Sequence, residues 1–178
     1  MERLFSEYSG IYEKHLRIGL LRTDTYQDYG LYHGKLGMAI LFYEYSRKHK
    51  DKLYEIYADE LINSIETIPS NLSFDIHKGL SGIAWGILYL FKRNFLTGDL
   101  NHILSDLDYK IIKQEKFSKE ECKSILSYIK YKEEYMSSVN KNDKNFILSL
   151  KKNHLLSIYQ GELYDEIKIL RIIWSNWL

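Results

Sequence analysis

A glycine turn that occurs twice, 45 residues apart, constrains the fold of this chain more than any other feature. The first copy contains Gly34-Lys35-Leu36-Gly37 and the second contains Gly79-Leu80-Ser81-Gly82. The apolar positions after each turn match in kind, as Met38 and Ile83 do. A repeat of about 40–47 residues without a strand pattern has the size of a two-helix unit. The sequence therefore predicts an all-α chain built from helical-hairpin repeats.

Helical spacing of apolar residues, with capping residues between the helices, continues this pattern along the whole chain. Asp51, Asp99 and Ser118 stand where N-caps are expected, and Glu121 completes a capping box with Ser118. We expect helices over about residues 3–21, 34–49, 52–65, 80–92, 100–111, 119–129, 146–155 and 162–177.

The charge and hydropathy of the chain argue against two classes of partner. Lys and Arg total 25 while Asp and Glu total 24, so nothing indicates attraction to nucleic acid or to acidic lipid. The lysine-rich stretch 110–152 contains enough glutamate to be interpreted as a solvated face. No apolar run approaches the roughly 18–20 residues of a membrane span, and the first residues lack the pattern of a signal peptide. We therefore expect a single cytoplasmic domain over residues 1–178.

Both glycine turns open a helix, and that position suits a binding site. Glycine has no Cβ, so the loop can lie close to a neighbouring helix or a ligand. The free N–H groups of the first helical turn and the helix dipole favour a nearby anion or carbonyl. The alternative is that the glycines only allow tight packing between repeats. The residues expected to bind a substrate or partner are Gly34, Gly37, Gly79, Gly82, Tyr32 and Trp85.

The residues around both turns resemble successive repeats of the lanthionine synthetase C-like (LanC-like) family. The resemblance covers about residues 25–112 and rests on segments 30–39 and 75–83, with Trp85-Gly86-Ile87 and segment 96–99 as their continuation. It implies an α/α toroid of the six- to seven-barrel type, of which this chain would form the first half. Residues 113–178 would then form a divergent helical tail.

The resemblance also implies a chemistry and its residues. Cyclases of this family add cysteine thiols of a precursor peptide to dehydroalanine or dehydrobutyrine, and a zinc ion lowers the pKa of the thiol. Asp75 occupies the position of an active-site aspartate that handles protons, and His33 and His77 are further catalytic candidates in the two turns. The alternatives are that Asp75 caps the helix after it and that the histidines are structural or merely exposed.

The zinc ligands of the family do not occur in this sequence. The family uses one cysteine and a Cys-His pair, whereas the only cysteine here is Cys122, which lies among apolar residues. That setting favours a small buried hydrophobic residue over a ligand or nucleophile. We therefore predict no metal site and no cofactor in this chain.

Three functions remain open on these residues. The chain is a LanC-like protein of peptide maturation that binds a precursor peptide or a modifying enzyme, without the zinc cyclase site. Alternatively, it is a thioether-forming cyclase whose metal ligands come from a second chain. The third alternative is a non-catalytic helical interaction module or a truncated relic. The apolar stripe of the last helix, through Trp174 and Trp177, fits either internal packing or the interface of a homodimer.

Overall fold

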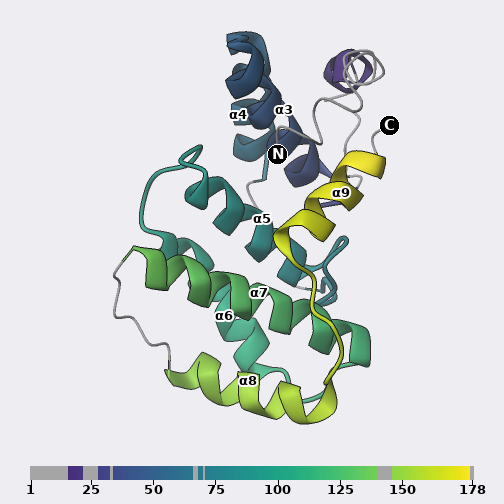
Figure 1. Ribbon diagram of the computed structural model, residues 1–178, viewed down its shortest axis with the longest axis vertical. Coiled ribbons are helices and arrows are strands. Elements are labelled where there is room, and N and C mark those ends of the chain that lie inside the picture. The colour runs from purple at the N-terminus through teal and green to yellow at the C-terminus, as the bar shows by residue number, and fades with distance from the viewer. Residues whose placement is uncertain are drawn as a thin grey trace. The chain divides into compact units, whose positions relative to one another are not determined.

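The computed structural model describes residues 16–21, 28–32, 34–65, 68–69, 71–139 and 146–176 (Figure 1). Over these ranges the only regular secondary structure is helical, which confirms the all-α expectation. No helix among them is long and apolar enough to cross a membrane. Besides a helical stretch at residues 16–21, the helices are α3 (Lys35–His49), α4 (Lys52–Asn63), α5 (Leu80–Lys92), α6 (Leu100–Lys113), α7 (Lys119–Ser138), α8 (Phe146–Ile158) and α9 (Glu166–Asn176).

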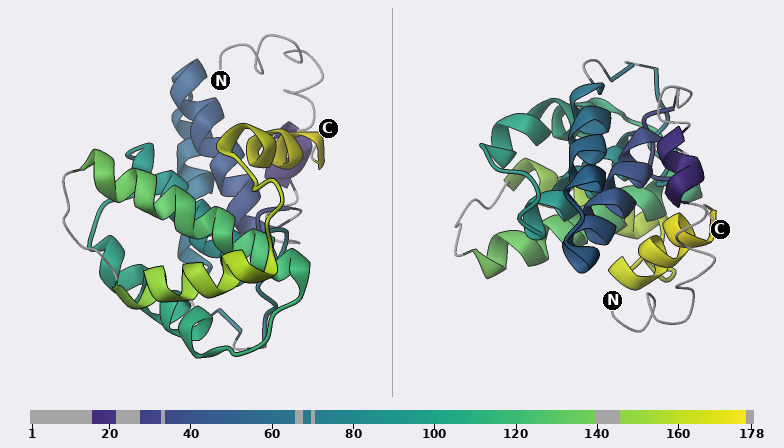
Figure 2. Two further views of the ribbon diagram at one scale, coloured as in Figure 1. Left: turned by 60° about the horizontal axis from the view of Figure 1, so that its bottom comes forward. Right: turned by 90° about the horizontal axis from the view of Figure 1, so that it is seen from above.

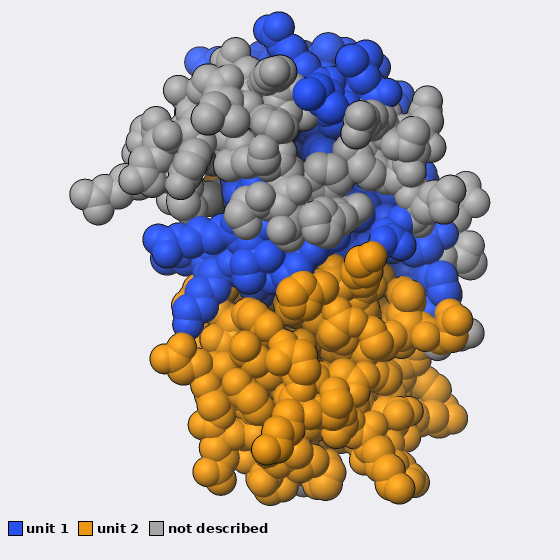
Figure 3. All heavy atoms as spheres, turned by 90° about the vertical axis from the view of Figure 1, so that its right-hand side faces the viewer, with its two compact units in different colours: residues 1–70, 166–178 blue, residues 71–165 orange. Residues whose placement is uncertain are grey.

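The contacts between residues divide the chain into two compact units, which Figure 3 colours separately. Unit 1 consists of residues 1–70 and 166–178 and contains α3, α4 and α9. Unit 2 consists of residues 71–165 and contains α5 to α8. The expectation of a single domain stays a prediction, because a division by contacts does not measure independent folding.

In unit 1, α3 and α4 form a helical hairpin with an aromatic core. The chain reverses at Lys50, which has a left-handed backbone (φ 56°), and the Asp51 carboxylate then caps the first turn of α4. Phe42 and Tyr45 of α3 both contact Tyr54 of α4, with ring centroids 5.5 and 4.5 Å apart. All three rings are buried, so their contact removes apolar surface from water and stabilises the hairpin. The Asp51 cap was predicted and is confirmed.

In unit 2, α5 is the most deeply buried helix and packs against α6 and α7 (Figure 2). Its Trp85 stacks on Tyr89 at 5.4 Å and on Tyr131 of α7 at 4.8 Å. Helix α8 in turn contacts α6 and α7. The predicted Asp99 cap of α6 and the capping box of Ser118 and Glu121 at the start of α7 are both present.

A buried polar cluster joins α6 to α7. Asp108 accepts a hydrogen bond of 2.7 Å from the Tyr128 hydroxyl and forms an ion pair with Lys132. The three residues are only 5 %, 0 % and 6 % exposed. Burial and the adjacent Asp108 charge raise the pKa of Tyr128 well above its usual value. Because a buried charge without its partner is costly, this cluster favours one register of the two helices.

The last helix begins at Glu166, four residues later than the predicted start at Glu162. The preceding residues 159–165, called the strap here, do not form a helix, and Tyr164 of the strap is bound to α7. The Tyr164 N–H donates to Ser127 Oγ at 2.9 Å, and the Tyr164 hydroxyl donates to Glu120 at 2.6 Å. These bonds hold the strap in a non-helical conformation. In α9, Trp174 is only 5 % exposed, whereas Trp177 lies outside the described residues.

Candidate functional site

The two glycine turns have the same backbone geometry. Two main-chain hydrogen bonds close each turn, and both partners in the second turn lie 45 residues after their counterparts in the first. Lys35 donates to Asp28 and Gly37 to Gly30, while Leu80 donates to Ser73 and Gly82 to Asp75, with distances of 2.8, 3.3, 2.8 and 3.3 Å. The predicted repeat is therefore confirmed down to single hydrogen bonds.

Glycine is required in these turns because the backbone approaches it closely. Gly34 and Gly79 have extended backbones that other residues also adopt, with φ of −113° and −90°. A Cβ on Gly37 would lie 1.9 Å from the Leu31 carbonyl oxygen, and a Cβ on Gly82 would lie 2.1 Å from that of Ile76. These four glycines are buried, so each turn packs tightly on its own backbone.

The two aromatic residues predicted to bind a partner are buried as well. Tyr32 is 2 % exposed, and Trp85 is 0 % exposed within its stack of rings. Both belong to the core of the repeats, so an altered side chain at either position would first change packing. Direct contact of the glycines, Tyr32 and Trp85 with a substrate or partner stays a prediction.

Asp75 of the second turn differs in kind from its counterpart in the first turn, where Gly30 occupies the equivalent position. Its carboxylate accepts backbone N–H groups of His77 at 2.7 Å and Lys78 at 2.9 Å, and also the Ser73 hydroxyl. Partial burial alone would raise the pKa of Asp75, but these hydrogen bonds outweigh it and lower the pKa. The N-cap of α5 is Gly79, so the alternative that Asp75 caps that helix is wrong. Asp75 instead orders the loop that precedes α5, because its carboxylate binds Ser73, His77 and Lys78 of that loop.

Glu121 connects the start of α7 to the second turn, a contact that the sequence did not predict. One of its oxygens accepts the Ser118 N–H at 2.9 Å, and the other accepts the Phe74 N–H at 3.2 Å. Partial burial and the nearby Asp75 charge favour a higher pKa for Glu121, but the hydrogen bonds outweigh them and lower it. The capping box was visible in the sequence, whereas a hydrogen bond across 47 residues has no local signal.

Tyr164 of the strap completes this group of ionisable residues. Burial, its hydrogen bond to Glu120 and the more distant charge of Asp75 all raise the pKa of Tyr164. The Lys123 amine lies 3.9 Å from the centre of the same ring. We call Asp75, Glu120, Glu121 and Tyr164 the second-turn cluster. It lies entirely in unit 2 and combines three carboxylates with one hydroxyl.

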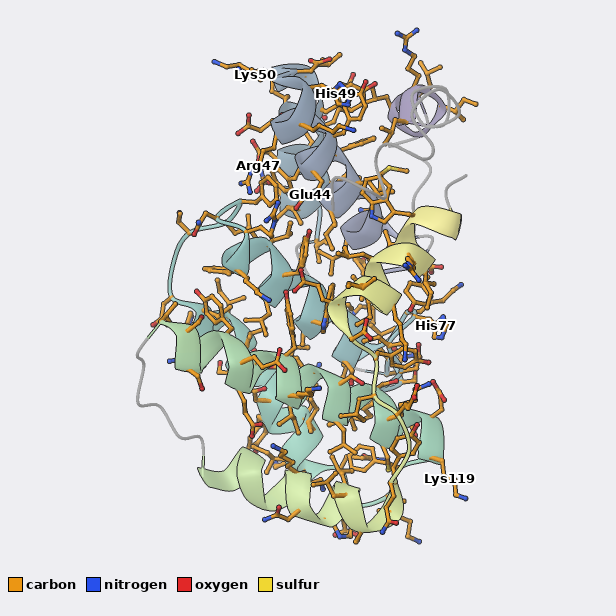
Figure 4. All side chains as sticks on the ribbon, viewed as in Figure 1. Glu44, Arg47, His49, Lys50, His77 and Lys119 are labelled. Atoms are coloured by element: carbon orange, nitrogen blue, oxygen red, sulfur yellow. The ribbon has the colours of Figure 1, made fainter. Side chains whose placement is uncertain are left out.

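Only one of the two predicted histidines belongs to the residues that the structure describes. His77, labelled in Figure 4, is exposed at the surface, and its backbone N–H donates to the Asp75 carboxylate. His33 lies outside the described residues. A catalytic role for either histidine stays a prediction.

The side chains that the structure describes do not fit the zinc ion that the resemblance implies. Cys122 is fully buried, and burial together with the Glu121 charge raises the pKa of its thiol, the opposite of what a zinc thiolate needs. Among the residues that the structure describes, no three His, Cys, Asp or Glu side chains are grouped so that they could hold a metal.

The fold and the site define a class: an all-helical repeat protein in which α3 and α5 each begin at a self-packed glycine turn, the second of which carries an aspartate. Comparison with known protein families agrees with this class. The family model described as "Lanthionine synthetase C-like protein" matches residues 25–127, which is more than half of the chain, and the chain belongs to this family. The match extends past residue 112 into α7 and so includes the capping box. Searches of curated proteins and of solved structures gave no match.

Proposed function

We propose that this chain is a LanC-like protein of peptide maturation that binds a precursor peptide or a modifying enzyme at the second-turn cluster, without a zinc cyclase site of its own. One observation carries the proposal. The first turn closes with the same hydrogen bonds although Gly30 stands in the place of Asp75. The Asp75 carboxylate is therefore not needed to close such a turn, which favours a role in binding.

The chemistry of the carboxylate favours binding over proton abstraction. A carboxylate with a lowered pKa stays ionised and is a weak base, which makes it a poor general base near neutral pH. Its oxygens have more acceptor capacity than their three present donors use, so an N–H group of a bound peptide could also donate to it. The half-buried position of Asp75 would strengthen such a bond relative to one in water. A cytoplasmic location is part of this proposal.

Native mass spectrometry of the tagged protein, purified from its own cells, tests the proposal. We expect a bound peptide that carries dehydrated residues, or a bound modifying enzyme, without a zinc-sized increment of mass. Asp75→Asn should lose this partner. Asp99→Asn is the matched control, because Asp99 is also an aspartate of unit 2 that accepts backbone N–H groups, but at the start of α6.

Two outcomes would contradict the proposal in different ways. If Asp75→Asn retains the partner as the wild type does, the second-turn cluster is not the binding site. If the wild-type complex contains zinc and a second chain that supplies its ligands, the assembled-cyclase alternative is correct. Circular dichroism of both variants separates a loss of binding from a loss of folding.

A further inference from the structure

The turn between α3 and α4 carries a dense group of basic side chains, four of them cations and one a histidine. We call Arg47, Lys48, His49, Lys50 and Lys52 the basic tip, and all five are exposed. Figure 4 labels three of them at this end of the hairpin. The only acidic residue between positions 47 and 52 is Asp51, so the segment has a formal charge of +3 with histidine neutral, against +1 for the whole chain.

The ends of the two helices explain some of these basic residues but not all of them. Arg47, Lys48 and His49 lie in the last turn of α3, where cations interact favourably with the helix dipole. Lys52, in contrast, is the first residue of α4, where the dipole disfavours a cation. The Asp51 carboxylate accepts the Leu53 N–H at 3.0 Å as a cap. Neither Lys50 nor Lys52 forms an ion pair with a described residue.

Two aliphatic side chains are exposed beside the basic tip. Leu53 and Ile56 of α4 are 50 % and 54 % exposed, whereas Tyr54 between them faces the core at 5 %. Residues three apart on a helix lie on the same face, so these two side chains form one small apolar surface next to the cations.

This combination fits a short acidic segment with an aliphatic side chain better than a lipid surface or a nucleic acid. Glu55, Asp59 and Glu60 are exposed on the same helix and would repel an extended polyanion. The tyrosine rings nearby, Tyr45 and Tyr54, are buried, and one face of the exposed His49 ring already stacks on Tyr45 with ring centroids 4.1 Å apart, so these rings offer little surface for stacking on bases. The four cations lie within six residues of the chain, about two helical turns, so the charged surface is only as long as a short peptide segment.

We propose that the basic tip, together with Leu53 and Ile56, binds an acidic, leucine-containing segment of a partner protein. This surface lies in unit 1 and uses no residue of the second-turn cluster, so it goes beyond the function proposed above and does not depend on it.

Fluorescence anisotropy with the full chain tests this proposal. The probes are a labelled peptide of glutamates interrupted by leucines, an all-glutamate peptide of equal length, and a peptide with lysines in place of the glutamates. The tip variant combines Lys48→Gln, Lys50→Asn and Lys52→Gln. The control variant combines Lys113→Gln, Lys116→Gln and Lys119→Gln, which removes the same charge from exposed positions of unit 2.

We expect the glutamate–leucine peptide to bind and its affinity to fall with added salt. The tip variant should weaken binding by about tenfold, since three exposed ion pairs are lost, while the control variant should change it by less than about twofold. Leu53→Ser with Ile56→Ser should weaken binding of the leucine-containing peptide only.

The proposal is overturned if the wild type does not bind the glutamate–leucine peptide, or if both lysine variants weaken binding equally. It is also overturned if phosphatidylglycerol vesicles or single-stranded DNA bind more tightly than the peptide, because the partner would then be a lipid surface or a nucleic acid. Binding of the lysine peptide with similar affinity would show that charge complementarity does not direct the contact.

Discussion

The substitution Gly82→Ala tests whether the glycine turn is closed by its own backbone. An alanine Cβ at this position would lie 2.1 Å from the carbonyl oxygen of Ile76, and real Cβ atoms do not approach other atoms closer than 3.0 Å. The obstacle is main chain, so it cannot move away by changing a rotamer. The loop would have to shift by about 1 Å, which strains the hydrogen bonds that Leu80 and Gly82 donate to it.

The expected cost follows from these contacts. Overpacking against a fixed group costs about 1–3 kcal/mol, and two weakened hydrogen bonds add about 1 kcal/mol each. Alanine recovers about 1 kcal/mol of helix propensity, because position 82 is in the first turn of α5. We therefore expect the free energy of unfolding to fall by about 2–4 kcal/mol in urea titrations followed by circular dichroism.

Ser81→Ala is the matched control in the neighbouring position. Ser81 is 0 % exposed, and its hydroxyl has no hydrogen-bond partner among the described residues. Its removal leaves no donor unpaired, so stability should stay equal or rise. If Gly82→Ala is as stable as the wild type, the explanation of the glycine by close backbone approach is refuted. If Ser81→Ala lowers the free energy of unfolding as much as Gly82→Ala does, the turn is sensitive to any substitution, and the close approach of the Ile76 carbonyl does not explain the effect.

Three further predictions follow from the contacts within unit 2. Asp108→Ala should destabilise the chain in urea by about 3–5 kcal/mol because it leaves Lys132 buried and unpaired, while adding Lys132→Met should restore most of the loss. The pKa of Asp75 is lower in the folded chain than its ordinary value of 3.8, so its stabilisation is present above about pH 4 and is lost as the pH falls through the folded pKa. Asp75→Asn should therefore flatten the acid side of the stability profile, and an unchanged profile would contradict the assigned hydrogen bonds. Tyr164→Phe should speed amide hydrogen exchange in the strap, since it removes the bond to Glu120, and equal exchange would mean that this bond does not hold the strap.

The elements with local signals could be predicted from the sequence. Asp51 and Asp99 stand directly before apolar helical patterns, and their carboxylates do cap α4 and α6. Ser118 and Glu121 are three residues apart, so the capping box needs no information from elsewhere in the chain. The repeated turn also belongs to this group, because its close backbone contacts can only be met by glycine.

The features that depend on distant residues could not be predicted. The apolar spacing around Leu163 indicates a helix from about Glu162, but the hydrogen bonds of Tyr164 to α7 keep that segment out of the helix. Glu121 was recognised as a cap, yet its contact with Phe74 becomes visible only when α7 is placed beside the second turn. Likewise, the sequence does not show whether a tyrosine or tryptophan near a turn binds a partner or packs in the core, and Tyr32 and Trp85 are in fact buried.

The shared geometry of the two turns has a consequence for how such a chain can change over time. The main chain closes both loops, so the residue at the position of Gly30 and Asp75 can be exchanged while the repeat keeps its shape. A new side chain could arise there in one copy and be selected while the other copy stays as it was. The protein thus contains another turn of the same shape without the carboxylate of its candidate site. The substitution Gly30→Asp tests whether an aspartate in the first turn acquires the lowered pKa of Asp75.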